Sequence, residues 1–63
     1  MNRIQEYRKQ KKWTQEDLAR RLGVERSAVA KWESGKSQPQ AACLIALAEI
    51  FGCTVDEILG RGK

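Results

Sequence analysis

The sequence predicts an all-α fold, with five short helices around one small core. Apolar residues recur every three or four positions through most of the chain, and no segment alternates as a half-buried strand would. Glycines and Thr-led start signals divide the chain into helix-sized segments. Its 63 residues are enough for one domain, which we place at residues 1–60, followed by a flexible basic tail at residues 61–63.

The first helix is predicted over about residues 2–11. Its inward face carries residues at helical spacing: Ile4, Tyr7 and Lys11. Arg8 lies beside that face, and Trp13 closes it. Lys12 occupies the position at which a helix ordinarily ends in Gly or Asn, so a left-handed backbone there would be strained.

The second helix starts at Thr14, with Asp17 three residues later as an approximate capping box. Its apolar stripe is made of Leu18, Ala19 and Leu22. Gly23 ends the helix, and Val24 supplies the hydrophobic contact that often follows such an end.

The third helix is predicted over about residues 25–33, ended by Ser34 and Gly35. Its narrow apolar face carries Ala28, Val29 and Trp32. Its outward face carries Arg26, Ser27, Ala30, Lys31 and Ser34. Because short side chains separate the two long cations, another molecule can approach this outward face closely.

The fourth and fifth helices follow a polar loop that contains the single proline. The apolar stripe of the fourth helix is made of Ala41, Leu44, Leu47, Ala48 and Phe51, and Gly52 ends it. Thr54 and Glu57 form a second capping box. The fifth helix turns Val55, Ile58 and Leu59 inward and ends at Gly60.

The amino-acid composition favours some classes of function and counts against others. Twelve lysines and arginines against eight acidic residues give a net charge of +4, which favours a polyanionic partner, although charge of this size also serves solubility. The chain lacks histidine and has little room for an enzyme cleft, so we expect no enzyme, no metal and no cofactor. Cys43 and Cys53 are interpreted as buried small apolar residues, with a disulfide or metal site as the alternative. No secretory leader or membrane-length apolar run is present, so we expect a cytoplasmic protein.

The segment QEDLARRLGVERSAVAKW holds two short helices around a turn that contains Gly23. Ala19 offers the small residue that a steep helix crossing needs, and apolar anchors lie on both sides of the turn. This pattern indicates a helix-turn-helix, whose second helix fits the major groove of DNA. The same pattern also occurs as plain core packing.

Over nearly its whole length the chain resembles the Cro and phage-repressor (XRE-type) helix-turn-helix family. The most specific segments are TQEDLA, LGV, AVAKWESGK and GCTVDEILG, each at the family's spacing. The resemblance implies a lambda-repressor-like fold and a sequence-specific, double-stranded DNA-binding transcriptional regulator, with a repressor expected.

The resemblance also implies which residues contact DNA. The family's phosphate contacts map to Thr14, Gln15, Ser34, Lys36 and Gln38, and its base contacts map to Glu25, Arg26, Ser27, Ala30 and Lys31. Arg26 can pair with guanine O6 and N7 through two hydrogen bonds. Glu25 can accept from a cytosine amino group or, as an acid in the first helical turn, stabilise the helix dipole. The plain alternative for Arg26 and Lys31 is a solvated charged face.

Two further features follow from the family comparison. Arg8 and Glu33 occupy the positions of a structural salt bridge between the first and third helices. Trp13 and Trp32 are interpreted as core residues, with stacking on single-stranded bases as the alternative.

A weaker apolar stripe of Cys43, Ala46 and Ile50 on the fourth helix is interpreted as partly buried, or as a subunit contact if exposed. Because family members commonly pair on two-fold symmetric sites, we expect a monomer or weak homodimer that pairs on DNA. The alternative functions are a protein-interaction module, such as an antitoxin subunit with a protein partner, and charge-driven nucleic-acid binding.

Overall fold

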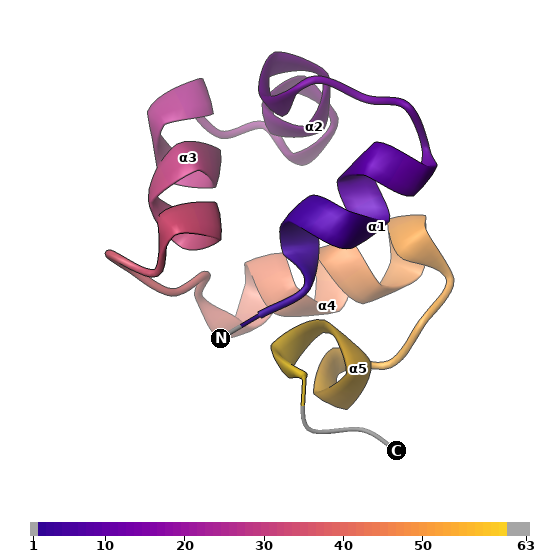
Figure 1. The fold of residues 1–63 in the computed structure, drawn as a ribbon. Helices are drawn as coiled ribbons and strands as arrows, with labels where there is room; N and C mark the ends of the chain where they lie inside the picture. Colours follow the sequence, from indigo (N-terminus) through magenta and orange to yellow (C-terminus); the bar gives the residue numbers. More distant parts are fainter. Residues whose placement is uncertain (1, 61–63) are drawn as a thin grey trace.

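The computed structural model describes residues 2–60 and confirms the all-α fold (Figure 1). Among these residues there are five helices and no strand. The helices are α1 (Ile4–Gln10), α2 (Gln15–Leu22), α3 (Arg26–Ser34), α4 (Ala41–Phe51) and α5 (Val55–Leu59). The predicted tail at residues 61–63 lies outside the described residues.

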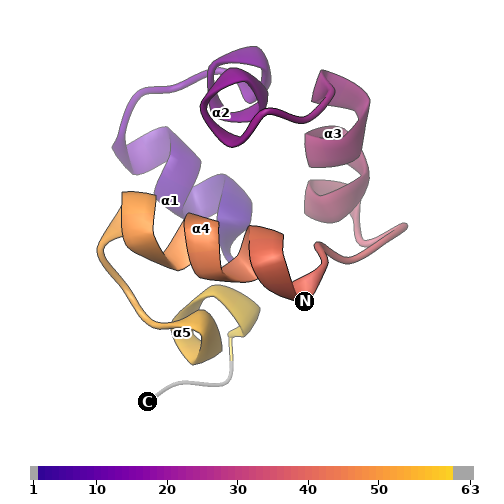
Figure 2. The same ribbon diagram turned by 180° about the vertical axis from the view of Figure 1, so that it is seen from behind.

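The helices form two close pairs, which contact each other through α2 and α4. Helix α2 packs against α3, α4 packs against α5, and α1 contacts α3. Both ribbon views place α3 at one edge of the molecule and α5 at the end opposite α2 (Figures 1 and 2). The buried apolar side chains come from all five helices: Ile4, Leu18, Ala19, Val29, Trp32, Leu47, Phe51 and Ile58.

Local signals in the sequence set the α2–turn–α3 unit. Thr14 Oγ1 accepts from the Asp17 N–H at 3.0 Å, and Asp17 Oδ2 accepts from the Thr14 N–H at 2.9 Å, which confirms the capping box. Gly23 ends α2 with a left-handed φ of 72°. The Val24 N–H then donates to the Ala19 carbonyl at 3.0 Å, so the turn closes back on α2.

Helix α1 is shorter than predicted, because its first two expected residues bond elsewhere. The Asn2 side chain accepts from the Ile4 N–H at 3.1 Å, and the Arg3 N–H donates to the Ile58 carbonyl at 2.7 Å. Ile4 is buried and Tyr7 half-buried, as predicted. Lys11 is exposed, so its predicted inward position is wrong: it follows the last helical residue and no longer faces the core.

Helix α3 begins and ends one residue later than predicted. Glu25 is therefore the residue before the helix, with an extended backbone and no side-chain cap hydrogen bond. The predicted place of Glu25 in the first helical turn is wrong. Ala28 is half-buried, while Val29 and Trp32 are fully in the core.

On α4 two expectations need correction. Ala41 is exposed and does not belong to the buried stripe, because it begins the helix beyond the turns that hold Leu47 and Phe51. Cys43, Ala46 and Ile50 are half-buried, as interpreted. The large exposed apolar residue of this helix is Ile45, at 56% exposure, which the predicted stripe did not include.

The cysteines and tryptophans pack against the core, but of the four only Trp32 is fully buried. Both cysteines are free and half-buried, and burial raises the pKa of the Cys53 thiol, which keeps it protonated at neutral pH. Trp32 is buried at 5% exposure. The Trp13 ring lies 6.0 Å from the Phe51 ring, with the Arg21 guanidinium 4.1 Å from its centroid on a face of the ring.

Lys12 has a φ of 63°, the single positive φ outside glycine among the described residues. A side chain at such a φ crowds the following carbonyl, which costs about 1–2 kcal/mol. We therefore expect Lys12→Gly to raise the free energy of unfolding by about 1 kcal/mol, since glycine loses some of this gain through a more flexible unfolded chain. Thermal unfolding followed by circular dichroism measures the change, with a melting temperature about 4–8 °C higher.

Gly23→Ala is the matched control, because Gly23 has a φ of 72° and open space where a Cβ would stand. This variant should lose stability through the same strain. A lower melting temperature for Lys12→Gly would show that the backbone at Lys12 is not strained.

Candidate nucleic-acid interface

The outward face of α3 is uncovered. Arg26, Ser27 and Lys31 are exposed and Ala30 is half-buried, while Val29 and Trp32 on the other face are in the core. No helix lies beyond α3 at its edge of the molecule in either ribbon view (Figures 1 and 2). Two cations separated by short side chains therefore face open solvent.

The starts of α2 and α3 share an open groove, which we call the α2–α3 groove. One part of it is lined by Arg8, Trp13, Thr14, Gln15, Glu16 and Arg26. The adjoining part is lined by Glu16, Ala19, Arg20, Val24 and Arg26. The structure thus brings Arg26 of α3 next to the two residues that begin α2, although 12 positions separate Arg26 from Thr14 in the sequence.

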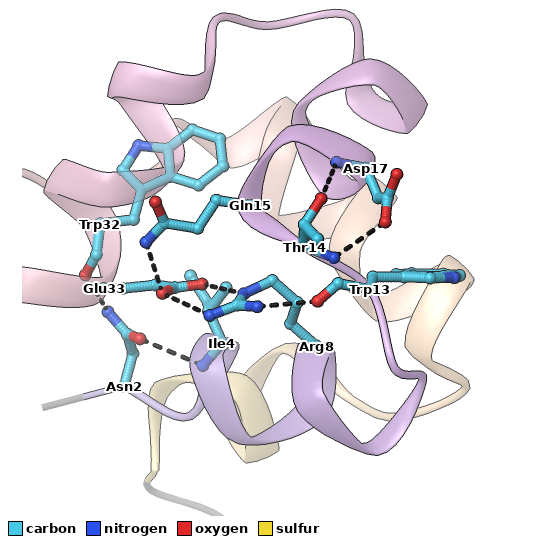
Figure 3. Close-up of polar contacts among 9 residues, drawn as sticks. All are labelled: Asn2, Ile4, Arg8, Trp13, Thr14, Gln15, Asp17, Trp32 and Glu33. Atoms are coloured by element: carbon cyan, nitrogen blue, oxygen red, sulfur yellow. Dashed lines mark hydrogen bonds and ion pairs between the residues drawn. The ribbon is translucent and has the colours of Figure 1, made fainter.

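The predicted pair of Arg8 and Glu33 is present and buried (Figure 3). Arg8 Nε donates to Glu33 Oε2 at 2.7 Å, and Arg8 Nη2 donates to Glu33 Oε1 at 3.1 Å. The two side chains are 10% and 4% exposed. A third bond from Arg8 Nη1 reaches the Trp13 carbonyl at 2.7 Å, so one guanidinium joins α1, the turn before α2 and the end of α3.

Gln15 belongs to the same network, which its predicted role as a phosphate contact did not anticipate. Its Nε2 donates to Glu33 Oε1 at 3.0 Å, and its side chain is half-buried (Figure 3). A primary amide nitrogen carries two hydrogens, so one remains for another acceptor. The start of α2 is thereby held against the end of α3.

The remaining predicted phosphate contacts lie at two places. Thr14 is exposed at the start of α2. Ser34, Lys36 and Gln38 are exposed at the far end of α3 and in the loop after it. Ser34 Oγ donates to the Lys31 carbonyl at 3.1 Å, so the hydrogen of this hydroxyl is already bonded within the helix.

Sequence reasoning missed three residues that shape this surface. Asn2 Nδ2 donates to the Trp32 carbonyl at 2.9 Å and ties the start of the chain to α3, a contact that no spacing rule reveals. Glu16 and Arg20 line the α2–α3 groove and form an exposed pair at 3.4 Å. Their separation of four residues on one helix is a signal that could have found them.

Ser27 and Glu25 also contact each other. Ser27 Oγ donates to Glu25 Oε1 at 3.4 Å, so the acid lies beside a predicted base-contacting hydroxyl. Within residues 2–60 there is no cluster of acidic or cysteine side chains that could hold a metal ion. No helix in this part of the chain is long and apolar enough to cross a membrane.

Comparison with known proteins agrees with this geometry. A family model described as helix-turn-helix matches residues 4–58. The crystal structure of the P22 c2 repressor protein in complex with a synthetic operator superimposes with a TM-score of 0.87 at 32% identity, covering 95% of this chain and 91% of that one. A transcriptional regulator from Listeria innocua superimposes with a TM-score of 0.86 at 28% identity, over 95% of this chain and 56% of the other.

The curated relatives are also described as helix-turn-helix transcriptional regulators. The transcriptional regulator AnsR of Bacillus subtilis is 41% identical over 100% of this chain and 54% of its own length. The transcriptional activator BcrR of Enterococcus faecalis is 44% identical over 90% of this chain, but only 28% of its own length. The chain therefore spans about half of one of these relatives and less than a third of the other.

The buried Glu33 carboxylate generates a stability prediction. Glu33→Ala leaves the Arg8 guanidinium buried without its anion, which should lower the free energy of unfolding by about 3–5 kcal/mol. A loss of this size approaches the whole stability expected of so small a core. Urea unfolding followed by tryptophan fluorescence measures it.

Glu16→Ala is the matched control, because both side chains of the Glu16–Arg20 ion pair are exposed to solvent. That variant should change stability by no more than about 0.5 kcal/mol. Equal small effects of the two substitutions would contradict the role given to Glu33.

The Asp17 carboxylate generates a pH prediction. A hydrogen bond from the Thr14 N–H holds the pKa of Asp17 below its ordinary value. A carboxyl with a lowered folded pKa stabilises the protein above its unfolded pKa, about 3.9, and this contribution is lost as the pH falls through the folded value. Wild type should therefore exceed Asp17→Asn in stability at neutral pH, and the gap should close below about pH 4. Urea unfolding across that range measures the gap, and a gap independent of pH would contradict the assignment.

Proposed function

The chain belongs to the helix-turn-helix family of the Cro and phage-repressor type, and from this membership we propose that it binds double-stranded DNA sequence-specifically and regulates transcription. The uncovered outward face of α3 carries the proposal. Its short side chains allow it to approach the floor of a DNA groove. Among the described residues, no acidic group lies within 4 Å of the charged atoms of Arg26 or Lys31 on this face. The family assignment favours this function over a protein-interaction module.

Base reading is assigned to the outward residues of α3 and the residue before it. Arg26 is exposed at the first helical position, where it can reach guanine O6 and N7. Lys31 lies at the opposite edge of the same outward face, about 1.4 turns further along the helix, and Ser27 and Ala30 add short contacts between the two cations. Glu25 can accept from cytosine N4, and its bond with Ser27 restrains both side chains.

Phosphate contacts are assigned to the start of α2 and to the end of α3 with the loop after it. Thr14 and Gln15 lie at the start of α2, which the Gln15–Glu33 bond holds against the end of α3, while Ser34, Lys36 and Gln38 lie at that end or in the loop after it. The nine residues of α3 span about 13 Å, which is close to the about 12 Å width of the major groove. The phosphate-binding groups can thus meet the DNA backbone beside the groove that α3 enters.

The protein acts by occupying its site, and it catalyses no reaction. We assign it a repressor role in the cytoplasm, exercised as a weak homodimer that pairs on a two-fold symmetric operator. The P22 c2 repressor structure, solved with an operator, supports the repressor assignment.

Selection from a pool of randomised duplexes at near-physiological salt tests the function. We expect enrichment of two inverted half-sites with centres about 10 base pairs apart, since each copy presents one α3 to successive major grooves. A pool that stays random would remove sequence-specific regulation by this chain alone.

Two substitutions separate base reading from phosphate binding on the selected site. Arg26→Ala should lower the affinity for the best site by about 1–3 kcal/mol and relax the preference at one position. Lys36→Ala should weaken all sequences alike and reduce the slope of log affinity against log salt by about one. Filter binding or fluorescence anisotropy across a salt series measures both, and identical behaviour of the two variants would contradict these roles.

A further inference from the structure

Lys12 combines a strained backbone with a free positive charge. Its φ of 63° is a conformation that glycine adopts without strain. The Lys12 N–H donates to the Lys9 carbonyl at 2.9 Å, and the Trp13 N–H donates to the Arg8 carbonyl at 3.2 Å. These bonds complete a helix ending that most proteins build with glycine. Backbone strain of this kind is concentrated at functional positions.

The side chain of Lys12 has no structural task among residues 2–60. It is exposed, and no hydrogen bond or ion pair engages it. A cation after the last turn of α1 interacts favourably with the helix dipole, but Lys9 and Lys11 are exposed at the same helix end and already supply that interaction without a left-handed backbone. The dipole therefore does not explain why a lysine takes the strained position.

The turn that carries Lys12 is held beside the start of α2. Arg8 Nη1 binds the Trp13 carbonyl at 2.7 Å, and Thr14 caps α2 through its bonds with Asp17. Thr14 lies two positions after Lys12, a distance of at most about 7 Å along the chain. Phosphates on one strand follow each other at about 3.4 Å along the helix axis, so a phosphate neighbouring the one at the α2 start lies within reach of a lysine side chain.

We propose that Lys12 binds a DNA phosphate next to the one contacted by the start of α2. This inference rests on the proposed function and adds a sequence-independent contact to it. The positive charge at this position strengthens DNA binding at the expense of backbone strain, so stability and affinity should respond to its removal in opposite directions.

The test compares Lys12→Gly, Lys12→Arg and Lys9→Gln on a random-sequence 20-base-pair duplex across a salt series, with melting temperatures measured in parallel. Lys12→Gly should melt higher yet bind about three- to tenfold more weakly at low salt, with the slope of log affinity against log salt reduced by about 0.9. Lys12→Arg should keep the wild-type slope. Lys9→Gln removes the same charge from the same helix end and should alter the slope by clearly less.

Two other results would overturn the Lys12 proposal, and a third would overturn the proposed function itself. Unchanged affinity and slope in Lys12→Gly would overturn it, and so would an equal loss in Lys9→Gln, which would assign the effect to overall charge. If the wild type binds neither this duplex nor any selected one, the proposed function itself fails. Binding by the wild type together with an unaltered Lys12→Gly leaves that function standing and removes only the Lys12 contact.

Discussion

The buried ion pair between Arg8 and Glu33 is the interaction on which the shape of the proposed DNA surface depends. Two hydrogen bonds join the side chains, and each partner holds a further group: Arg8 the Trp13 carbonyl, Glu33 the Gln15 amide. A buried pair of this kind adds little net stability, because desolvation of both charges offsets their attraction. Its effect is geometric, since it sets α1, the start of α2 and the end of α3 at one mutual position.

This geometry matters because the core is small. Eight buried apolar residues hold five helices among the described residues, and the shortest helix has only five residues. Helices this short are unstable in isolation, so their ends need partners for the free N–H groups at the start and the free carbonyl groups at the end. The capping boxes at Thr14 and Thr54 and the left-handed glycines after α2, α3, α4 and α5 meet that need locally.

At the proposed DNA surface, several residues lack the stabilising arrangements that the rest of the fold uses. Lys12 keeps a strained backbone, and the outward face of α3 lacks the four-residue ion pairs that usually cover a solvated helix. Glu25 precedes α3 without capping it through its side chain. Lys12, Arg26 and Lys31 are thereby left exposed as cations, which is an advantage for a chain that meets a polyanion.

The sequence by itself determined the five helices, the turn at Gly23 and the capping box at Thr14, and it marked Lys12 as a position where a left-handed backbone would be strained. Each of these depends on residues within four or five positions of one another, where propensity and spacing act directly. The buried Arg8–Glu33 pair was also foreseen, but from a family resemblance, since 25 positions separate the two residues. Periodicity erred at helix ends, as for Lys11, Glu25 and Ala41, because a repeat does not reveal where neighbouring helices stop covering a face.

Only the tertiary structure decided which groups share partners. It brought Gln15 to Glu33, Asn2 to the Trp32 carbonyl and Arg26 to the start of α2, and it left Ile45 exposed on α4. These contacts depend on how helices cross, and a crossing is set by packing among side chains distant in sequence. Local patterns therefore sufficed for the elements, while the polar network behind the proposed DNA surface required the assembled fold.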